Sequence, residues 1–181
     1  MREDPDAALV LASRAGDRQA FAQLLARYEK PVFNAAYRIL HHREDAADVT
    51  QTAFLRAYEH LDRYDPAQRF FAWIYRIAMN EALDVGARKA PVDVELDVMP
   101  DPAGGPDDQA EGAQADARVQ DALMALALEQ RVLVVLKHVQ DCSYEQMAAI
   151  LECPVKTVKS RLFTARRALR ERLLERGWEP A

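Results

Sequence analysis

Residues 142–173 read CSYEQMAAILECPVKTVKSRLFTARRALRERL, and this stretch decides the fold of the carboxyl-terminal part of the chain. Ser143 and Gln146 have the spacing of a capping box, which predicts a helix from Tyr144 to Leu151. Pro154 suits the first position of a second helix, because its φ is already helical and its missing N–H is not needed there. The stretch therefore predicts a helix, a short turn and a second helix, which is the arrangement of a helix-turn-helix.

The second helix of this pair is amphipathic. Apolar residues recur along it at spacings of three and four, which places them on one face: Val155, Val158, Leu162, Ala165, Leu169 and Leu173. This face is predicted to pack on a core. Seven basic residues but only one acid, Glu171, lie between Lys156 and Arg172, so the opposite face and both of its edges are cationic.

A cationic helix of this kind suits the major groove of duplex DNA. The groove admits one helix, whose exposed front reaches base edges while cations at its edges meet the phosphates. Nine residues are the candidate DNA contacts: Lys156, Thr157, Lys159, Ser160, Arg161, Phe163, Thr164, Arg166 and Arg167. A solvated cationic face is the simpler alternative, but the capping box, the short turn and the two basic edges together favour DNA.

The rest of the chain is also predicted to be helical. Apolar periodicity indicates helices at 5–15, 18–41, 45–62, 67–88 and 117–139. Gly16 is a stop signal after the first of them, and Asp45 with Asp48 resembles a capping pair at the start of the third. Pro31 is predicted to kink the second helix, because proline removes a helical hydrogen bond.

Residues 91–117 are predicted to form a flexible acidic linker. They are rich in Pro, Gly and Asp, and residues 91–118 carry a net charge of −7, against 0 for 1–90 and +2 for 119–181. The predicted fold class is therefore all-α, with two small helical domains, 1–90 and 118–181, joined by a linker that lets them engage well-separated sites. A passive solvated spacer is the alternative interpretation of this segment.

Composition excludes several classes of protein. The two cysteines and four histidines have no zinc-ligand spacing, no apolar run is long enough to span a membrane, and the amino terminus is acidic where an export signal is basic. Phosphate-binding loops, dinucleotide fingerprints and catalytic triads are also missing from the sequence. We therefore expect a cytoplasmic protein that is not an enzyme and that uses no cofactor and no metal.

Two long stretches resemble a known family. Residues 142–173 resemble conserved region 4, and residues 45–84 resemble conserved region 2, of the group IV (extracytoplasmic-function, ECF) sigma factors of bacterial RNA polymerase, in the sigma-70 family. The resemblance implies that region 4 recognises the promoter −35 element and that region 2 recognises and melts the −10 element. It also implies that the protein binds core RNA polymerase, at the clamp coiled coil of the largest subunit and at the flap.

The resemblance extends to individual residues of region 2. It implies that Tyr64 lies in a pocket for a flipped −10 base, that Asn80 hydrogen-bonds this base, and that Arg56 and Arg76 touch the DNA backbone. Stacking on an aromatic surface and hydrogen bonds to the base edge are how proteins hold an extruded base. Trp73 belongs to the same group, but its helical spacing favours a packing role.

The resemblance also implies protein partners. Four residues match the family segment that docks on the polymerase clamp: Asp48, Gln51, Phe54 and Leu55. An anti-sigma factor is a further expected partner, because family members are commonly held by one. The alternative function is a stand-alone helix-turn-helix regulator, but an acidic chain would bind free duplex weakly without polymerase.

Overall fold

The computed structural model describes residues 5–89 and 106–177, with side chains from Ala115 onward in the second range. The elements before the gap are α1 (Ala7–Arg14), α2 (Arg18–Leu40), α3 (Arg43–Glu59), η1 (Leu61–Arg63) and α4 (Phe70–Arg88). Those after it are α5 (Pro106–Met124), α6 (Leu128–Val134), the π-helical segment η2 (Val135–Val139), α7 (Tyr144–Ile150) and α8 (Val155–Glu175). The described residues contain no strand, and the all-α prediction is confirmed.

Helices α1–α4 form the first helical unit, and the elements from α5 to α8 form the second. The helix boundaries of the first unit follow from local signals. Gly16 has a φ of 98° and separates α1 from α2, as predicted. Asp17 caps α2, because its Oδ1 accepts hydrogen bonds from the backbone N–H groups of Gln19 (2.8 Å) and Ala20 (3.2 Å). α2 continues through Pro31 as a single helix. The apolar face of α2 packs on α3 and α4.

The predicted capping pair of α3 is wrong. The helix begins at Arg43, two residues before Asp45, and its N-cap is His42. The His42 Nδ1 atom accepts a hydrogen bond from the backbone N–H of Asp45 at 3.3 Å. An imidazole nitrogen thus takes the role that we had expected of a carboxylate, and this substitution is difficult to recognise in a sequence.

The predicted single helix at 117–139 is also wrong, because the chain forms two helices there. α5 begins earlier, at Pro106, and ends at Met124; α6 begins at Leu128. The break is stabilised by Arg131, whose Nη2 donates hydrogen bonds to the carbonyls of Met124 (2.9 Å) and Leu126 (3.1 Å). The last carbonyls of a helix have no partner within it, so a buried guanidinium can end a helix that apolar periodicity would continue.

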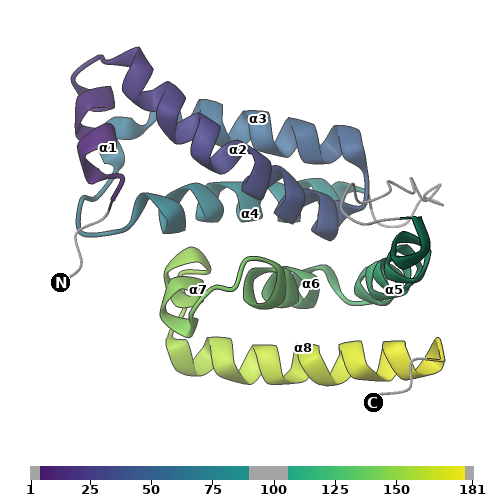
Figure 1. Ribbon diagram of the computed structural model, residues 1–181. Coiled ribbons are helices and arrows are strands. Elements are labelled where there is room, and N and C mark those ends of the chain that lie inside the picture. Colours follow the sequence, from purple (N-terminus) through teal and green to yellow (C-terminus); the bar gives the residue numbers. More distant parts are fainter. Residues whose placement is uncertain (1–4, 90–105, 178–181) are drawn as a thin grey trace.

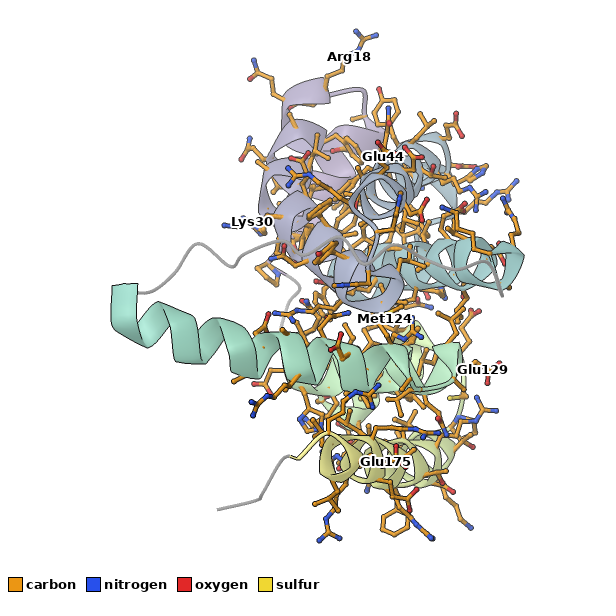
Figure 2. All side chains as sticks on the ribbon, turned by 90° about the vertical axis from the view of Figure 1, so that its right-hand side faces the viewer. Arg18, Lys30, Glu44, Met124, Glu129 and Glu175 are labelled. Atoms are coloured by element: carbon orange, nitrogen blue, oxygen red, sulfur yellow. The ribbon has the colours of Figure 1, made fainter. Side chains whose placement is uncertain are left out.

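The predicted linker at 91–117 is partly helical. Its residues 106–117 belong to α5, and its residues 91–105 lie outside the described part of the chain. Figure 2 shows α5 running along the boundary between α1–α4 and α8, toward Met124. The Arg38 side chain of α2 contacts α5, through an ion pair with Asp116 at 2.8 Å and a hydrogen bond to Gln120. The acidic segment therefore contributes part of the packed structure.

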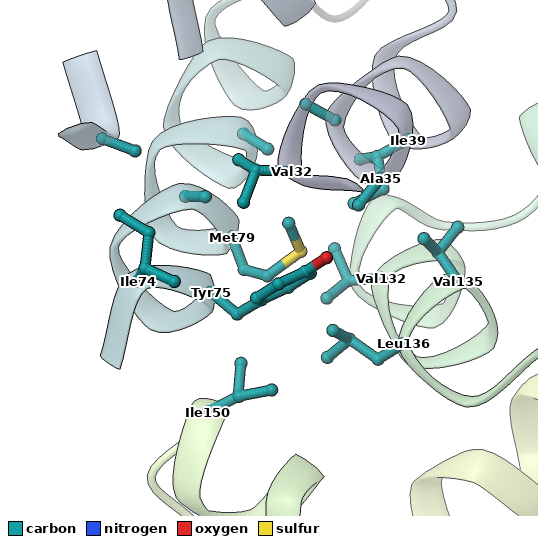
Figure 3. Close-up of a cluster of buried hydrophobic side chains, with 14 of the residues drawn as sticks. Val32, Ala35, Ile39, Ile74, Tyr75, Met79, Val132, Val135, Leu136 and Ile150 are labelled. Carbon is teal, nitrogen blue, oxygen red and sulfur yellow. The ribbon is translucent and has the colours of Figure 1, made fainter. Parts of the chain in front are cut away.

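The two helical units pack on each other. Helices α1–α4 form one layer, and α6 and α7 lie between this layer and α8 (Figure 1). A single apolar cluster joins them, with side chains of α2 and α4 facing those of α6, η2 and α7 (Figure 3). The labelled members of this cluster are Val32, Ala35, Ile39, Ile74, Tyr75, Met79, Val132, Val135, Leu136 and Ile150.

Candidate nucleic-acid interface

The helix-turn-helix is formed by α7 and α8, and its capping box is confirmed. Ser143 Oγ accepts a hydrogen bond from the Gln146 N–H at 3.1 Å, and Gln146 Oε1 accepts one from the Ser143 N–H at 2.7 Å. Pro154 is the N-cap of α8 rather than its first helical residue. In the turn, Glu152 adopts a φ of 49°. The two helices are joined by four residues, 151–154, one more than the three-residue turn that the sequence predicts.

The α8 helix presents the two faces that its sequence predicts. Val158, Leu162 and Ala165 are buried, and the rest of the apolar stripe is half-buried. Eight of the nine candidate −35 contacts are exposed, and the ninth, Thr157, is half-buried. Phe163 is 73% exposed on the same side. Because α8 is the outermost helix of its layer, this face is open to solvent (Figure 1).

Most cations of α8 have only weak partners inside the protein. Arg167 pairs with Glu171 at 3.1 Å, one turn away, with both side chains largely exposed. Such surface pairs contribute about 0–1 kcal/mol, so phosphates can replace them at little cost. Arg166 Nε donates a hydrogen bond to His138 Nε2 at 3.1 Å. Burial, Arg166 and Lys137 lower the pKa of His138, which favours the neutral imidazole that can accept this bond.

A second candidate site is a cavity of about 350 Å³ beside α4. It brings together Arg56, Trp73, Arg76 and Asn80, which are four of the five residues predicted to contact the −10 element. Its other lining residues are His60, Arg63, Ile77 and Glu152. Guanidinium and amide groups around one cavity suit a nucleotide, since they can bind phosphate oxygens and base edges.

Three polar residues of this cavity, His60, Arg63 and Glu152, are not among the predicted −10 contacts. His60 immediately precedes η1 and Arg63 is its last residue, and their closeness in sequence to Arg56 was the available signal. Glu152 comes from the turn between α7 and α8, and no local pattern connects it with α4. The cavity therefore includes a residue that only the tertiary structure brings there.

Tyr64 lies next to the cavity but does not line it. Its side chain is 4% exposed, its hydroxyl donates a hydrogen bond to the Gln68 carbonyl at 2.5 Å, and its ring packs on Phe70 and Trp73. A base could stack on Tyr64 only after these side chains move. Its role in holding a flipped base stays a prediction.

Both arginines predicted to contact the −10 backbone are paired with acids. Arg56 Nη1 lies 2.6 Å from Glu81 Oε2, within the first unit. Arg76 Nη1 lies 2.8 Å from Glu152 Oε1, which belongs to the second unit. Three arginines line the cavity, and two of their guanidinium groups form ion pairs, one with Glu81 and one with Glu152.

A third candidate site is an apolar groove of about 790 Å³ between α2 and α3. Three of the four residues predicted to bind polymerase line it, namely Gln51, Phe54 and Leu55, whereas Asp48 is exposed outside its lining. The other lining residues are mostly apolar: Phe21, Leu25, Glu29, Lys30, Phe33, Ala47, Thr50 and Tyr58. A groove of this kind fits the apolar face of an amphipathic helix.

Comparison with known proteins decides the family. Sigma-70 region 2 matches residues 24–90, and Sigma-70, region 4, matches residues 116–169. The ECF RNA polymerase sigma factor SigW of Bacillus subtilis is 32% identical over 88% of this chain and 92% of its own length. The chain belongs to the ECF sigma factors of the sigma-70 family.

Further relatives cover both regions of this sigma factor. The ECF RNA polymerase sigma-E factor of Escherichia coli K12 is 33% identical over 91% of this chain and 92% of its own length. The solved structure of CnrH in complex with the cytosolic domain of CnrY has a TM-score of 0.73, at 29% identity, and covers 94% of this chain and 97% of that one. RpoE of Bartonella quintana, in complex with the anti-sigma factor NepR, has a TM-score of 0.69, at 25% identity, and covers 86% of this chain and 96% of that one.

Membership of this family establishes the general function. The protein is an RNA polymerase sigma factor that directs transcription initiation, and it is not an enzyme. The alternative of a stand-alone helix-turn-helix regulator is therefore wrong, because such a regulator has no region 2. Within 5–89 and 106–177, no helix is both long and apolar enough to cross a membrane.

The two cysteines of the sigma factor lie near the helix-turn-helix. Cys142 is buried and Cys153 is half-buried, and both are free thiols. Burial raises the pKa of the Cys142 thiol to about 11, so it carries almost no thiolate at neutral pH. Because the thiolate is the reactive form, Cys142 is a packing residue.

Proposed function

We propose that this sigma factor reads the −35 element with α8, holds an opened −10 element in the cavity beside α4, and docks on core polymerase with the groove between α2 and α3. The observation that carries the proposal is the division of α8 into a buried aliphatic face and an exposed cationic face. A helix with this division can insert into the major groove without losing its own packing. The sigma factor acts in the cytoplasm, together with the polymerase.

Run-off transcription with core polymerase tests the −35 assignment. The templates form a library that varies the −35 element, and the variants are Lys156→Ala and Arg167→Ala, each removing a cation from the exposed face of α8. We expect losses that depend on the −35 sequence, because contacts to base edges carry sequence information. Arg18→Ala removes an exposed arginine of α2 and is the matched control. An equal loss on all templates would instead indicate phosphate contacts.

The −10 assignment is tested at Asn80, which is exposed on the cavity wall. Asn80→Ala should leave holoenzyme assembly intact and reduce strand opening, measured by permanganate reactivity of unpaired thymines. The other asparagine of the chain, Asn34, is exposed on α2, so Asn34→Ala is the matched control. Unchanged opening in the Asn80 variant would remove this residue from the −10 site.

Polymerase docking is tested at Leu55, which is 55% exposed at the groove between α2 and α3. Leu55→Asp places a charge on a surface that must lose water when a helix binds, so we expect core polymerase affinity to fall at least about tenfold. Leu11 of α1 is 57% exposed and lies outside the groove lining, so Leu11→Asp is a control of equal exposure. Similar affinities of the two variants would exclude the groove as the docking surface.

An anti-sigma factor is a further proposed partner. CnrH and RpoE of Bartonella quintana, both similar in structure to this chain, were each solved with a bound partner, which in the second case is named an anti-sigma factor. The open apolar groove between α2 and α3 offers such a partner a binding surface. Affinity purification of the tagged sigma factor from cells, with and without Leu55→Asp, tests whether a partner binds there.

A further inference from the structure

The three arginines of the cavity beside α4 differ in what their side chains contact. Arg56 forms an ion pair with Glu81, and Arg76 forms one with Glu152. Arg63 is exposed, and within the described part of the chain its side chain forms neither an ion pair nor a hydrogen bond. Among the described residues, Arg63 is therefore the cavity arginine whose full charge is available to an anion.

The ion pair of Arg56 is made with a buried acid. The Glu81 side chain is 9% exposed, and its Oε2 atom lies 2.6 Å from Arg56 Nη1. Within the described residues Oε2 accepts no hydrogen bond of good geometry, so the guanidinium charge compensates for the water that burial removes. Removing one partner of such a pair leaves an uncompensated buried charge, which is strongly destabilising. Arg56 is therefore retained at Glu81.

The pair of Arg56 and Glu81 also weakens the attraction of Arg56 for DNA. Arg56 lies on α3 and Glu81 on α4, so the pair belongs to the first unit alone. A phosphate that approaches Arg56 meets a guanidinium whose charge is balanced by a carboxylate in contact with it, and the net Coulomb attraction is small. A phosphate within reach of Arg63 meets an unbalanced positive charge.

The backbone on both sides of Arg63 is anchored in the core. Arg63 is the last residue of η1, and its neighbours Leu61 and Tyr64 are buried. The Arg63 N–H donates a hydrogen bond to the His60 carbonyl at 2.9 Å, which closes the turn. The Arg63 side chain therefore extends from a fixed turn, at the same cavity that the exposed Asn80 side chain lines.

A nucleotide offers a base edge and a phosphate, and an amide and an unpaired guanidinium suit these two parts. We propose that Arg63 is the phosphate-binding residue of the −10 site, and that Arg56, which the family resemblance assigns to the DNA backbone, is a structural partner of Glu81. The inference rests on the proposed function of the cavity beside α4. It adds a DNA contact that the resemblance does not assign and removes one that it does.

The test measures binding of single-stranded DNA to the holoenzyme by fluorescence anisotropy at several salt concentrations. The probe is a labelled non-template strand with the −10 sequence of a promoter that the holoenzyme transcribes, and it lacks a −35 element. Arg63→Ala removes the charge, whereas Arg63→Lys keeps it. A double variant, Arg56→Gln with Glu81→Gln, replaces the ion pair by two amides without changing the net charge. Arg14→Ala removes an exposed arginine of α1 outside the cavity lining and is the matched control.

We expect Arg63→Ala to weaken probe binding about 3- to 10-fold and to lower the slope of log affinity against log salt by about 0.7, the value for one phosphate contact of a single strand. Arg63→Lys should keep the slope, because the charge remains. The double variant should also keep the slope, since a balanced ion pair releases few counterions from DNA. Arg14→Ala should bind like wild type.

Thermal denaturation of the free sigma factor tests the role of Glu81 separately. Arg56→Gln alone leaves the Glu81 carboxylate buried without a cation, so Tm should fall by about 4–8 °C. Adding Glu81→Gln should restore most of this loss, because the buried charge is then removed as well. Arg63→Ala should stay within about 2 °C of wild type, as is usual for an exposed side chain. An unchanged Tm in Arg56→Gln would show that Glu81 does not retain Arg56 and would overturn the structural role of the pair.

The binding outcomes distinguish the inference from the proposed function. If Asn80→Ala weakens probe binding but Arg63→Ala does not, Arg63 is not the phosphate contact and the −10 assignment stands. A slope that falls as much in the double variant as in Arg63→Ala would identify Arg56 as a phosphate contact and would also overturn the inference. If neither Asn80→Ala nor Arg63→Ala changes probe binding, the cavity is not the −10 site, and both proposals fail.

Discussion

The two candidate DNA sites of this sigma factor differ in how complete they are. The cationic face of α8 belongs to one helix and is open to solvent, so it exists as soon as the helix-turn-helix is folded. The cavity beside α4 has two arginines that are already paired with acids, and one of these acids comes from the other unit. A site on a single helix depends on local structure, whereas a site between packed units depends on whether they stay together.

Among the variants that test this difference, the largest change in stability is expected at Arg131, which connects the two units. Its side chain is buried and donates hydrogen bonds to carbonyls of α5 and to the Ile39 carbonyl of α2. Arg131→Ala leaves these buried acceptors unpaired, so the free energy of unfolding should fall by about 3 kcal/mol. Urea denaturation followed by circular dichroism measures it. Arg118→Ala, at an exposed position of α5, is the control. A loss below about 1 kcal/mol would mean that water replaces the guanidinium.

A smaller effect is expected when one arginine of each site is removed and duplex DNA binding by the free protein is compared. Arg161 is exposed on α8, whereas Arg76 is half-buried and paired with Glu152. Arg161→Ala should weaken duplex DNA binding by the free protein about 3- to 10-fold and lower the slope of log affinity against log salt by about one, because one phosphate contact is lost. Arg76→Ala should change neither value. Fluorescence anisotropy at several salt concentrations measures both. Equal effects of the two variants would contradict the difference between the sites.

A substitution in the capping box tests whether the site on α8 depends on local structure. Ser143→Ala removes one of the two reciprocal hydrogen bonds at the start of α7 and should lower the free energy of unfolding by about 1 kcal/mol. Ser160→Ala, at an exposed position of α8, should leave stability within about 0.5 kcal/mol of wild type. Thermal denaturation measures both. If Ser143→Ala were neutral, tertiary packing alone would hold α7 in place.

The smallest expected effect is the pH dependence contributed by His138. Its pKa in the folded protein is lowered from 6.5 by burial, Arg166 and Lys137, so the unfolded chain binds the proton more readily. The stability that neutral His138 contributes is therefore complete above pH 6.5 and decreases as the pH falls below that value. His138→Gln should reduce the loss of stability between pH 7.5 and 5.5, measured by urea denaturation at both pH values. An unchanged pH dependence would show that Arg166 moves away from a protonated His138.

Much of the fold could be predicted because its signals are local. The capping box at Ser143, the stop at Gly16 and the apolar stripe of α8 each depend on residues three or four positions apart. Two of the errors in helix boundaries came from side chains in unexpected roles. His42 caps α3 with an imidazole nitrogen, and Arg131 ends α5 by binding its last carbonyls from seven or eight positions away. Residue type alone did not indicate either interaction.

The candidate sites were also predicted only in part. The family resemblance pointed to four residues that the structure gathers around one cavity and to three that line one groove. It did not indicate that Tyr64 is buried under Phe70 and Trp73, because an aromatic residue in a loop has the same sequence signature whether it is covered or open.

The sequence by itself determined most helices of this sigma factor, the polarity of α8 and the membership of its family, because caps and helical periodicity act within a few residues. Only the tertiary structure decided that the two units share one apolar cluster and that Glu152 reaches Arg76, 76 positions away in the chain. The physical reason is that burial of apolar surface has no direction along the sequence. Which surfaces meet, and which charges then come together, is decided by the complete set of packed side chains.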